Sequence, residues 1–224
     1  REAIGDVARV LSGYVNAIVA RTYSHQTLEE LAVYSSVPVV NALSDAEHPC
    51  QALGDLLTIK EQFGEIGGVN IAFIGDGNNV ATSLALGAAS TGANFVAASP
   101  PGYQLDQCVI DLARQLATGY NSVIRQVISP REATQGSDVI YTDVWVSMGQ
   151  EMETKKRQHD FQGYQVNHPL MQTANPKAIF MHPLPAHHCE EISQGMLEHP
   201  QSVVFAQSEN RLHAQKSALE FLLS

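Results

Sequence analysis

Histidine, cysteine and glutamate side chains gather in one short segment, MHPLPAHHCEE, at residues 181–191. This composition fits a metal site, a catalytic histidine cluster, or a loop whose main chain binds the ligand. A zinc site usually takes its ligands from separated segments, whereas the consecutive His187, His188 and Cys189 point in different directions. Since no second Cys or His pair in the sequence has metal-site spacing, we do not expect a metal here.

The prolines of this segment favour the loop interpretation. Pro183 and Pro185 stand on either side of Leu184, favour an extended backbone and lack N–H donors. The carbonyl oxygens are then the groups left to face a ligand, and a row of such oxygens suits an NH2 group. We therefore expect the main chain of this loop to bind the ligand.

A second candidate segment, SDAEHPCQ at residues 44–51, opens a predicted helix with His48, Cys50 and Gln51. Free N–H groups and the dipole at a helix start favour an anion or a polarised carbonyl oxygen. Cys50 is either a nucleophile or, more commonly for a buried thiol, a bystander. Arg211 lies near the start of the predicted final helix, where a cation opposes the dipole, which suggests an external partner.

The segment GDGNNV, residues 75–80, follows a predicted strand and opens a helix, as dinucleotide-binding loops do. Val80 occupies the third glycine position, and the next strand ends AASPP with no acidic residue for a ribose hydroxyl. We therefore do not expect nucleotide binding. Asn79 caps the helix, presents its amide to a polar ligand, or does both.

The segment TDVWVSMGQE, residues 142–151, places Asp143 at the carboxyl end of a predicted strand. A carboxylate at that edge of a parallel sheet can bind a cationic group. Taken alone, Ser147 would be a helix cap and Met148 a core residue.

Short apolar strands alternate with helices throughout the chain, which predicts parallel sheets covered on both faces. The glycines of GEIGGVN predict a domain boundary after residue 64, with the helix of 49–63 bridging the two parts. The predicted fold class is α/β, with two domains, each a parallel β-sheet flanked by helices, linked by bridging helices. The predicted helices are 2–13, 24–35, 49–63, 79–91, 104–117, 131–135, 150–160, 190–198 and 208–223, and the predicted strands are 16–21, 37–43, 69–76, 94–99, 122–127, 138–144, 178–183 and 202–207.

The composition excludes several functions. A formal net charge of -10, with 13 basic residues spread over 224, argues against a nucleic-acid partner. Three widely separated cysteines suggest a reducing compartment, so we expect a cytoplasmic protein. We expect no membrane partner, because no apolar run is long enough for a bilayer and no signal peptide is apparent. Arg1 leads directly into a predicted helix without an initiating Met, as in a fragment.

The motifs HPCQALGD, GDGNN, DVWVSMGQE and MHPLPAHHCEE, in this order, resemble the ornithine carbamoyltransferases of the aspartate/ornithine carbamoyltransferase family. The resemblance covers the whole chain. It implies transfer of the carbamoyl group from carbamoyl phosphate to the δ-amine of ornithine, giving citrulline and phosphate in arginine biosynthesis. It also implies no cofactor, no metal and a homotrimer.

The resemblance further implies a division of labour among the domains and residues. Residues 1–64 would be the remaining part of the carbamoyl phosphate domain, 65–205 the ornithine domain, and 206–224 a helix packing back on the first. Catalytic roles would fall to Arg21, His48 and Asp143. Carbamoyl phosphate would be bound by Arg21, His48, Pro49, Cys50, Gln51, Pro183, Leu184 and Arg211, and ornithine by Asn79, Asp143, Ser147 and Met148.

Two departures from the family pattern matter. Ornithine enzymes usually have Cys where this chain has Pro183, and the related aspartate enzymes have HPLP there. The SMG stretch still favours ornithine, since the aspartate enzymes lack it. The family's phosphate-binding Ser-Thr-Arg-Thr motif is absent from the 224 residues, so the activity is expected of the intact polypeptide.

Three alternatives stay open on the sequence. The chain could carbamoylate another amine, such as putrescine or an acylated ornithine, because Pro183 replaces the usual Cys. It could be a catalytically silent, ligand-binding paralogue. A nicotinamide-dependent dehydrogenase would require nucleotide binding, against which the glycine pattern speaks.

Overall fold

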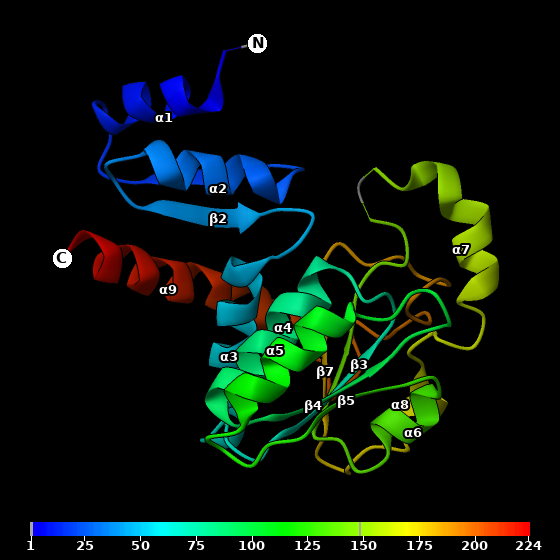
Figure 1. Ribbon diagram of the computed structural model, residues 1–224. Helices are drawn as coiled ribbons and strands as arrows, with labels where there is room; N and C mark the ends of the chain where they lie inside the picture. The colour runs from blue at the N-terminus through cyan, green and yellow to red at the C-terminus, as the bar shows by residue number, and fades with distance from the viewer. Residues whose placement is uncertain (1, 148) are drawn as a thin grey trace.

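The computed structural model describes residues 2–147 and 149–224, so that Arg1 and Met148 lie outside the described residues. Its strands form two parallel sheets, in a small lobe at the start of the chain and a larger lobe after it (Figure 1). This confirms the predicted α/β class. The strands are β1 (Ile18–Arg21), β2 (Val39–Leu43), β3 (Asn70–Ile74), β4 (Asn94–Ala98), β5 (Ile124–Val127), β6 (Val139–Thr142) and β7 (Ile179–Met181).

The helices follow the strands in the alternation that the sequence predicts. They are α1 (Ile4–Ser12), α2 (His25–Tyr34), α3 (Pro49–Phe63), α4 (Asn79–Thr91), α5 (Gln107–Ala117), α6 (Pro130–Thr134), the 3-10 helix η1 (Glu151–Glu153), α7 (Thr154–Asp160), α8 (His168–Met171) and α9 (Val204–Leu223).

The larger lobe contains a five-stranded parallel sheet in the order β5-β4-β3-β6-β7. Successive side chains of a strand point to opposite faces. On β3, Ile71 and Phe73 therefore pack in a core cluster with residues of α3, α4 and α5, while Ala72 and Ile74 pack with residues of α6 and α8. Burial on both faces explains the nearly continuous apolar sequence of the strand.

The smaller lobe has a two-stranded parallel sheet, β1 with β2, and two helices. Its buried core cluster consists of Ala8, Leu28 and Leu31, with Ile4, Ala20 and Val39 packed around it. This core is much smaller than those on the two faces of the five-stranded sheet.

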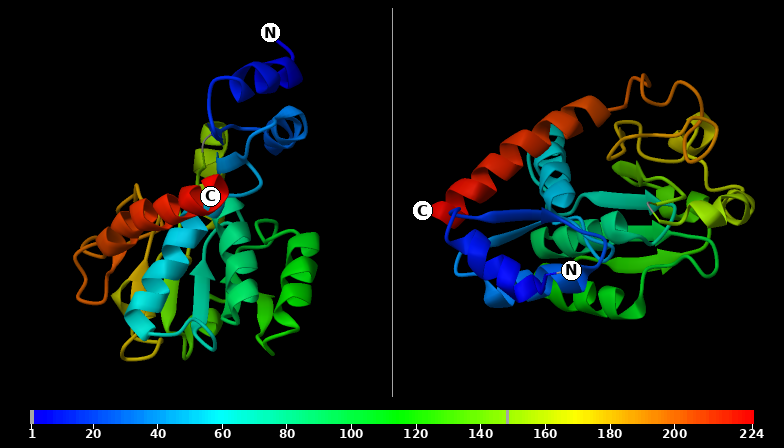
Figure 2. Two further views of the ribbon diagram at one scale, coloured as in Figure 1. Left: turned by 90° about the vertical axis from the view of Figure 1, so that its left-hand side faces the viewer. Right: turned by 90° about the horizontal axis from the view of Figure 1, so that it is seen from above.

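Helices α3 and α9 lie side by side between the two lobes (Figure 2). Pro49 starts α3, and Gly64, with a positive φ of 83°, ends it, as predicted. The close approach of α9 depends on Gly54: a Cβ built there would lie 2.9 Å from Cγ and 3.2 Å from Cα of Arg211.

Two predicted elements near the end of the chain are wrong. Residues 190–198 form turns instead of a helix, since Gly195 adopts a φ of 81° and the segment closes on its neighbours through bridges such as that between Val166 and Ile192. Residues 202–207 are not a strand either, because α9 already begins at Val204. A short apolar run such as SVVFAQ has no periodicity that separates strand from helix.

Candidate active site

The predicted functional side chains lie at the carboxyl ends of strands and at the start of α3. Arg21 ends β1, Asp143 follows β6, and His182 follows β7. His48 is the residue before α3, and its backbone N–H donates to Ser83 Oγ of α4 at 2.8 Å. This contact holds the start of α3 against the larger lobe.

His48 is buried, 6% exposed, and has two arginines in its electrostatic surroundings. Burial, with Arg211 and Arg21 adding to it, lowers the pKa of His48 to about 4. The imidazole is therefore neutral at pH 7. Its Nδ1 atom is buried without a hydrogen-bond partner among the described residues. A guanidinium from each of two distant segments thus acts on the same histidine.

Arg211 was predicted to lie near the start of the final helix. It lies seven residues after Val204, the first residue of α9, and is therefore beyond the first turn. The argument from the helix dipole is therefore wrong, because the helix begins four residues earlier than expected. The packing against Gly54 is what directs Arg211 towards the start of α3. Its Nε atom is buried and has no hydrogen-bond partner within the described part of the chain.

Cys50 behaves as a structural thiol. Its Sγ donates to the carbonyl oxygen of Asn41 on β2 at 3.4 Å, and burial raises its pKa. A raised pKa keeps the thiol protonated near neutral pH, which disfavours the nucleophile interpretation.

Asp55 lies one turn after Gln51 in α3 and is fully buried. Its carboxylate accepts three hydrogen bonds, from Gln51 Nε2 at 2.9 Å, Gln207 Nε2 at 2.7 Å and Tyr141 Oη at 2.9 Å. Burial raises the pKa of Asp55 to about 6, against the effect of these donors. Sequence analysis missed Asp55 and Gln207, since their spacing of 152 residues leaves no local signal.

Asp143 is buried, 8% exposed, and its partner is Asn78. Asn78 Nδ2 donates to Asp143 Oδ2 at 2.7 Å, and burial raises the pKa of Asp143 while nearby His182 lowers it. Asn78 also caps α4, accepting the N–H groups of Val80 and Ala81, so the sequence assignment of the cap to Asn79 is wrong.

Asn79 instead connects the two lobes. Its Nδ2 donates to the carbonyl oxygen of Ser44 at 2.7 Å, and its Oδ1 accepts the N–H of Val80 at 3.0 Å. The sequence signal for both asparagines was the same, because either could cap a helix that starts after GDGN.

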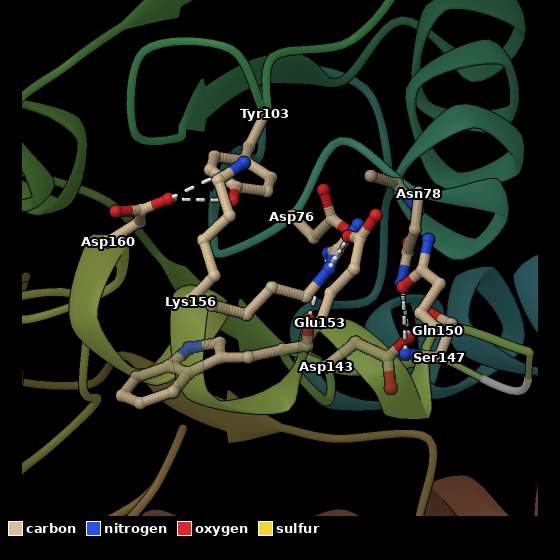
Figure 3. Close-up of polar contacts among 12 residues, drawn as sticks. Asp76, Asn78, Tyr103, Asp143, Ser147, Gln150, Glu153, Lys156 and Asp160 are labelled. Carbon is tan, nitrogen blue, oxygen red and sulfur yellow. Dashed lines mark hydrogen bonds and ion pairs between the residues drawn. The ribbon is translucent and has the colours of Figure 1, made fainter.

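The loop after Asp143 is fixed by Arg157 of α7, a residue that sequence analysis missed. Arg157 Nη1 donates to Asp76 Oδ2 at 2.6 Å and to the carbonyl oxygen of Trp145 at 2.9 Å, while its Nε donates to Glu153 Oε2 (Figure 3). The Arg157 and Asp76 side chains are about one-tenth exposed or less. Asp76, the second residue after β3, is thus engaged in positioning this loop.

Ser147 lies in the same loop beside Gln150 (Figure 3). Its backbone N–H donates to Gln150 Oε1 at 3.0 Å, and its carbonyl oxygen accepts the N–H of Gln150 at 3.1 Å. Gln150, and not Ser147, precedes η1, so Ser147 is not a helix cap. The next residue, Met148, lies outside the described part of the chain.

The HPLP turn after β7 is held by His182 and Glu191. The Leu184 N–H donates to His182 Nδ1 at 2.9 Å, so the imidazole proton is on Nε2, which faces Glu191 Oε1 at 3.2 Å. The backbone N–H of His187 donates to the same oxygen. Leu184 has a φ of 56°, so the predicted extended backbone is wrong at this residue, where the hydrogen bond to His182 closes a turn.

One group of possible metal ligands comes together within the described residues: His187, Glu190 and Glu191, whose ligand atoms all lie within 4.8 Å of one another. The sequence argument considered His187, His188 and Cys189 and did not anticipate this set. Glu191 Oε1 already accepts two hydrogen bonds within the loop, so this carboxylate stabilises the loop whether or not an ion binds.

A surface cavity of about 570 Å³ lies on the outer side of this region. Trp145, Cys189 and Glu190 contribute to its wall. None of the residues expected to bind carbamoyl phosphate lines it. The cavity is therefore separate from the candidate site.

Two parallel α/β lobes, joined along α3 and α9 and carrying histidine, arginine and buried carboxylate side chains at their strand ends, are the architecture of an enzyme with a site between two domains. The sequence matches the carbamoyl-P binding domain of aspartate/ornithine carbamoyltransferases over residues 1–61 and their Asp/Orn binding domain over residues 67–222. The chain belongs to the aspartate/ornithine carbamoyltransferase family.

Individual relatives agree with this assignment. The chain is 49% identical to an ornithine carbamoyltransferase of Oceanobacillus iheyensis, covering all of this chain and 69% of the relative, and 52% identical to that of Acidothermus cellulolyticus, covering 99% and 71%. The structure of the Pyrococcus furiosus ornithine carbamoyltransferase superposes with a TM-score of 0.96 at 50% identity, covering 99% of this chain and 71% of that one.

Proposed function

We propose that the intact polypeptide transfers the carbamoyl group of carbamoyl phosphate to the δ-amine of L-ornithine, giving L-citrulline and phosphate in arginine biosynthesis. The relatives' names support this reaction. The observation that carries it is the convergence of Arg21 and Arg211 on the neutral, buried His48, since these groups come from three separate segments. The chain spans about seven-tenths of the length of these relatives.

Carbamoyl phosphate is bound at the start of α3. Arg21 and Arg211 suit its phosphate through forked hydrogen bonds. Pro49, which has no N–H, and Cys50 begin the first turn of α3, where the positive end of the helix dipole favours an anion. At the other end of the substrate, the NH2 group meets oxygen acceptors, from the side chain of Gln51 and the main chain of Pro183 and Leu184.

The reaction passes through a tetrahedral species in which negative charge grows on the carbonyl oxygen. Arg21 and a neutral His48 stabilise this oxyanion as hydrogen-bond donors, because fixed dipoles act strongly in a site that excludes water. The ornithine δ-amine attacks the carbonyl carbon as the neutral amine, the C–O bond to phosphate breaks, and the departing phosphate takes the amine proton. A pKa of about 4 prevents His48 from acting as a general acid at pH 7.

Ornithine is bound at the carboxyl ends of β3 and β6. Asp143, oriented by Asn78, positions the amino acid, with Asn79, Ser147 and Met148 as the further ornithine-binding residues. The buried carboxylate of Asp143 supports a cationic substrate, because a positive partner offsets the free-energy cost of burying its negative charge. Because Pro183 replaces the usual Cys, a different amine substrate stays open, and the assay therefore includes a panel of amines.

We assign residues 1–64 to the carbamoyl phosphate domain, 65–205 to the ornithine domain, and 206–224 to a helix that returns to the first. The contact of Gly54 with Arg211 and the hydrogen bond from Asn210 to Thr58 support the last assignment. We further propose a cytoplasmic homotrimer. No helix in the described residues has the length and apolarity required to cross a bilayer.

The experiment is a citrulline assay with the intact polypeptide, carbamoyl phosphate and a panel of L-ornithine, N-acetylornithine, putrescine and L-aspartate. We expect product from L-ornithine at a kcat/KM at least 100-fold above that from any other amine, about 2.7 kcal/mol in transition-state binding. Preference for putrescine or N-acetylornithine would favour the alternative carbamoyltransferases. Carbamoyl phosphate binding without any product would favour the silent paralogue.

A further inference from the structure

The buried carboxylate of Asp55 lies behind the groups proposed to bind carbamoyl phosphate and takes no direct part in binding. It is 0% exposed, and all three of its hydrogen-bond donors come from different elements: Gln51 from α3, Tyr141 from β6 and Gln207 from α9. One carboxylate thus joins α3, strand β6 and α9.

An ionised carboxylate accepts hydrogen bonds and donates none, so it determines how neighbouring amides are turned. Gln51 and Gln207 both direct their Nε2 groups to Asp55 Oδ1, at 2.9 and 2.7 Å. Their Oε1 atoms must then point away from Asp55. With a pKa raised to about 6, Asp55 is mainly ionised at pH 7.

The two outward oxygens differ in their surroundings. Gln51 Oε1 is buried and has no hydrogen-bond partner among the residues that the structure describes. Gln207 Oε1 accepts the backbone N–H of His182 at 2.9 Å, and His182 directly precedes Pro183 and Leu184. An NH2 group has two protons and, away from water, needs at least two acceptors.

We propose that Asp55 is a positioning residue that sets both acceptors for the carbamoyl nitrogen: it turns the Gln51 amide directly and, through Gln207, anchors the HPLP turn. This inference rests on the proposed function, because it assumes that the ligand carries an NH2 group at this place. Asp55 itself touches neither substrate; it acts through Gln51 and Gln207.

The test uses Asp55→Leu, which keeps a similar side-chain volume but removes the carboxylate oxygen that accepts from both glutamines. Each glutamine then loses the hydrogen bond that turns its amide. Two probes that differ at the critical group report the result: phosphonoacetamide, which has the NH2, and acetyl phosphate, which has a methyl group in its place. Binding of each to the intact polypeptide is measured by calorimetry.

We expect Asp55→Leu to weaken phosphonoacetamide binding about 10-fold or more, the effect of one or two lost hydrogen bonds to a buried polar group. Acetyl phosphate binding should change less than 2-fold. With substrates, KM for carbamoyl phosphate should rise while KM for ornithine stays within 2-fold. Equal weakening of both probes would overturn the proposal, because a merely structural role affects both alike.

Tyr141→Phe is the matched control. It removes one donor to Asp55 Oδ2 and the 3.2 Å acceptor of Gln207 Nε2, whose 2.7 Å hydrogen bond to Asp55 Oδ1 remains. The protein should become less stable, yet the ratio of the two probe affinities should remain as in the wild type. A changed ratio in this variant would contradict the division between the two oxygens.

Gln207→Leu covers the case in which Asp55→Leu does not fold. It removes the connection to His182 and one donor to Asp55 but leaves Gln51 bonded to Asp55, so we expect about 5-fold weaker phosphonoacetamide binding with unchanged acetyl phosphate binding. If the ratio of the two probe affinities stayed unchanged in this variant, the proposed link from Asp55 through Gln207 to His182 would be refuted. Wild-type protein that binds phosphonoacetamide but makes no citrulline would instead refute the proposed function and leave the role of Asp55 standing.

Discussion

Burial and two guanidinium groups keep the His48 imidazole neutral, and this lowers the stability of the folded protein at low pH. Its pKa is about 4 in the folded protein and 6.5 in an unfolded chain, so the unfolded state binds more protons between these values. The stabilising contribution is complete above pH 6.5 and is lost as the pH falls towards 4. Relative to His48→Gln, the wild type should lose roughly 2 to 3 kcal/mol between pH 7.5 and 4.5.

Urea unfolding of both proteins at the two pH values measures this difference. Asp55 titrates in the same window with the opposite sign, because its pKa is raised to about 6. Its contribution is common to both proteins and cancels in the comparison. If the difference in unfolding free energy between the two proteins did not change with pH, the pKa of His48 would not be lowered by folding.

At the same scale, Asp143→Asn should separate the two substrates. The substitution removes the negative charge but retains an oxygen for Asn78 Nδ2, which donates to Asp143 in the wild type. We expect KM for ornithine to rise about 30-fold or more, as for a lost charge-assisted contact of about 2 kcal/mol, with KM for carbamoyl phosphate within 3-fold. Equal losses for both substrates, in steady-state assays of the intact polypeptide, would contradict the assignment.

At the scale of the elements, the contact between α3 and α9 leaves no space for a larger side chain at Gly54. Gly54→Ala would place a methyl group 2.9 Å from Cγ and 3.2 Å from the backbone of Arg211, so α9 must move. We expect a loss of about 1 to 3 kcal/mol in stability and weaker carbamoyl phosphate binding, because Arg211 moves with its helix. Lys60→Ala, at an exposed position of α3, is the control and should stay within about 0.5 kcal/mol in thermal unfolding.

The loop between β6 and α7 depends on one buried ion pair. Arg157→Met leaves Asp76 buried without its cation and frees the carbonyl oxygen of Trp145. We expect a loss of about 3 to 5 kcal/mol in denaturant unfolding and a higher KM for ornithine. The neighbouring Lys156→Met removes a 3.9 Å pair with Asp160 and a contact 5.4 Å from the centre of the Tyr103 ring, both made by an exposed lysine, and should cost less than about 0.5 kcal/mol.

Local patterns in the sequence predicted most elements because their signals are short-range. Pro49 and Gly64 mark both ends of α3, and the apolar runs of β3 and β6 mark a sheet that is buried on both faces. The region 190–207 failed because its conformation depends on bridges to Val166 and Phe180, which no local pattern reveals.

The candidate site shows the same limit. Arg21, His48, Asp143 and the HPLP segment could be proposed from the sequence because each lies at the end of a strand or directly before a helix. Asp55 and Arg157 could not, since they act on residues that other segments bring to them. The sequence therefore carries more signal for the groups proposed to face a ligand than for the groups that orient their neighbours.

At the scale of the whole molecule, the two lobes should differ in local stability. The five-stranded sheet has large buried clusters on both faces, whereas the described part of the smaller lobe has a two-stranded sheet over three fully packed residues, Ala8, Leu28 and Leu31. A sheet of two strands is marginal on its own. Regions with few buried apolar contacts open at a lower free energy than the global unfolding.

Hydrogen exchange of the 224-residue chain tests this difference. We expect amides of β3, β4 and β6 to exchange only through global unfolding, and amides of β1 and β2 to exchange at least 100-fold faster, about 2.7 kcal/mol less protection. Helix α3 should follow the larger lobe, because the His48 N–H bonds to Ser83 and Asp55 bonds to Tyr141 and Gln207 across the boundary. Equal protection of all strands would mean that these contacts couple both lobes into one cooperative unit.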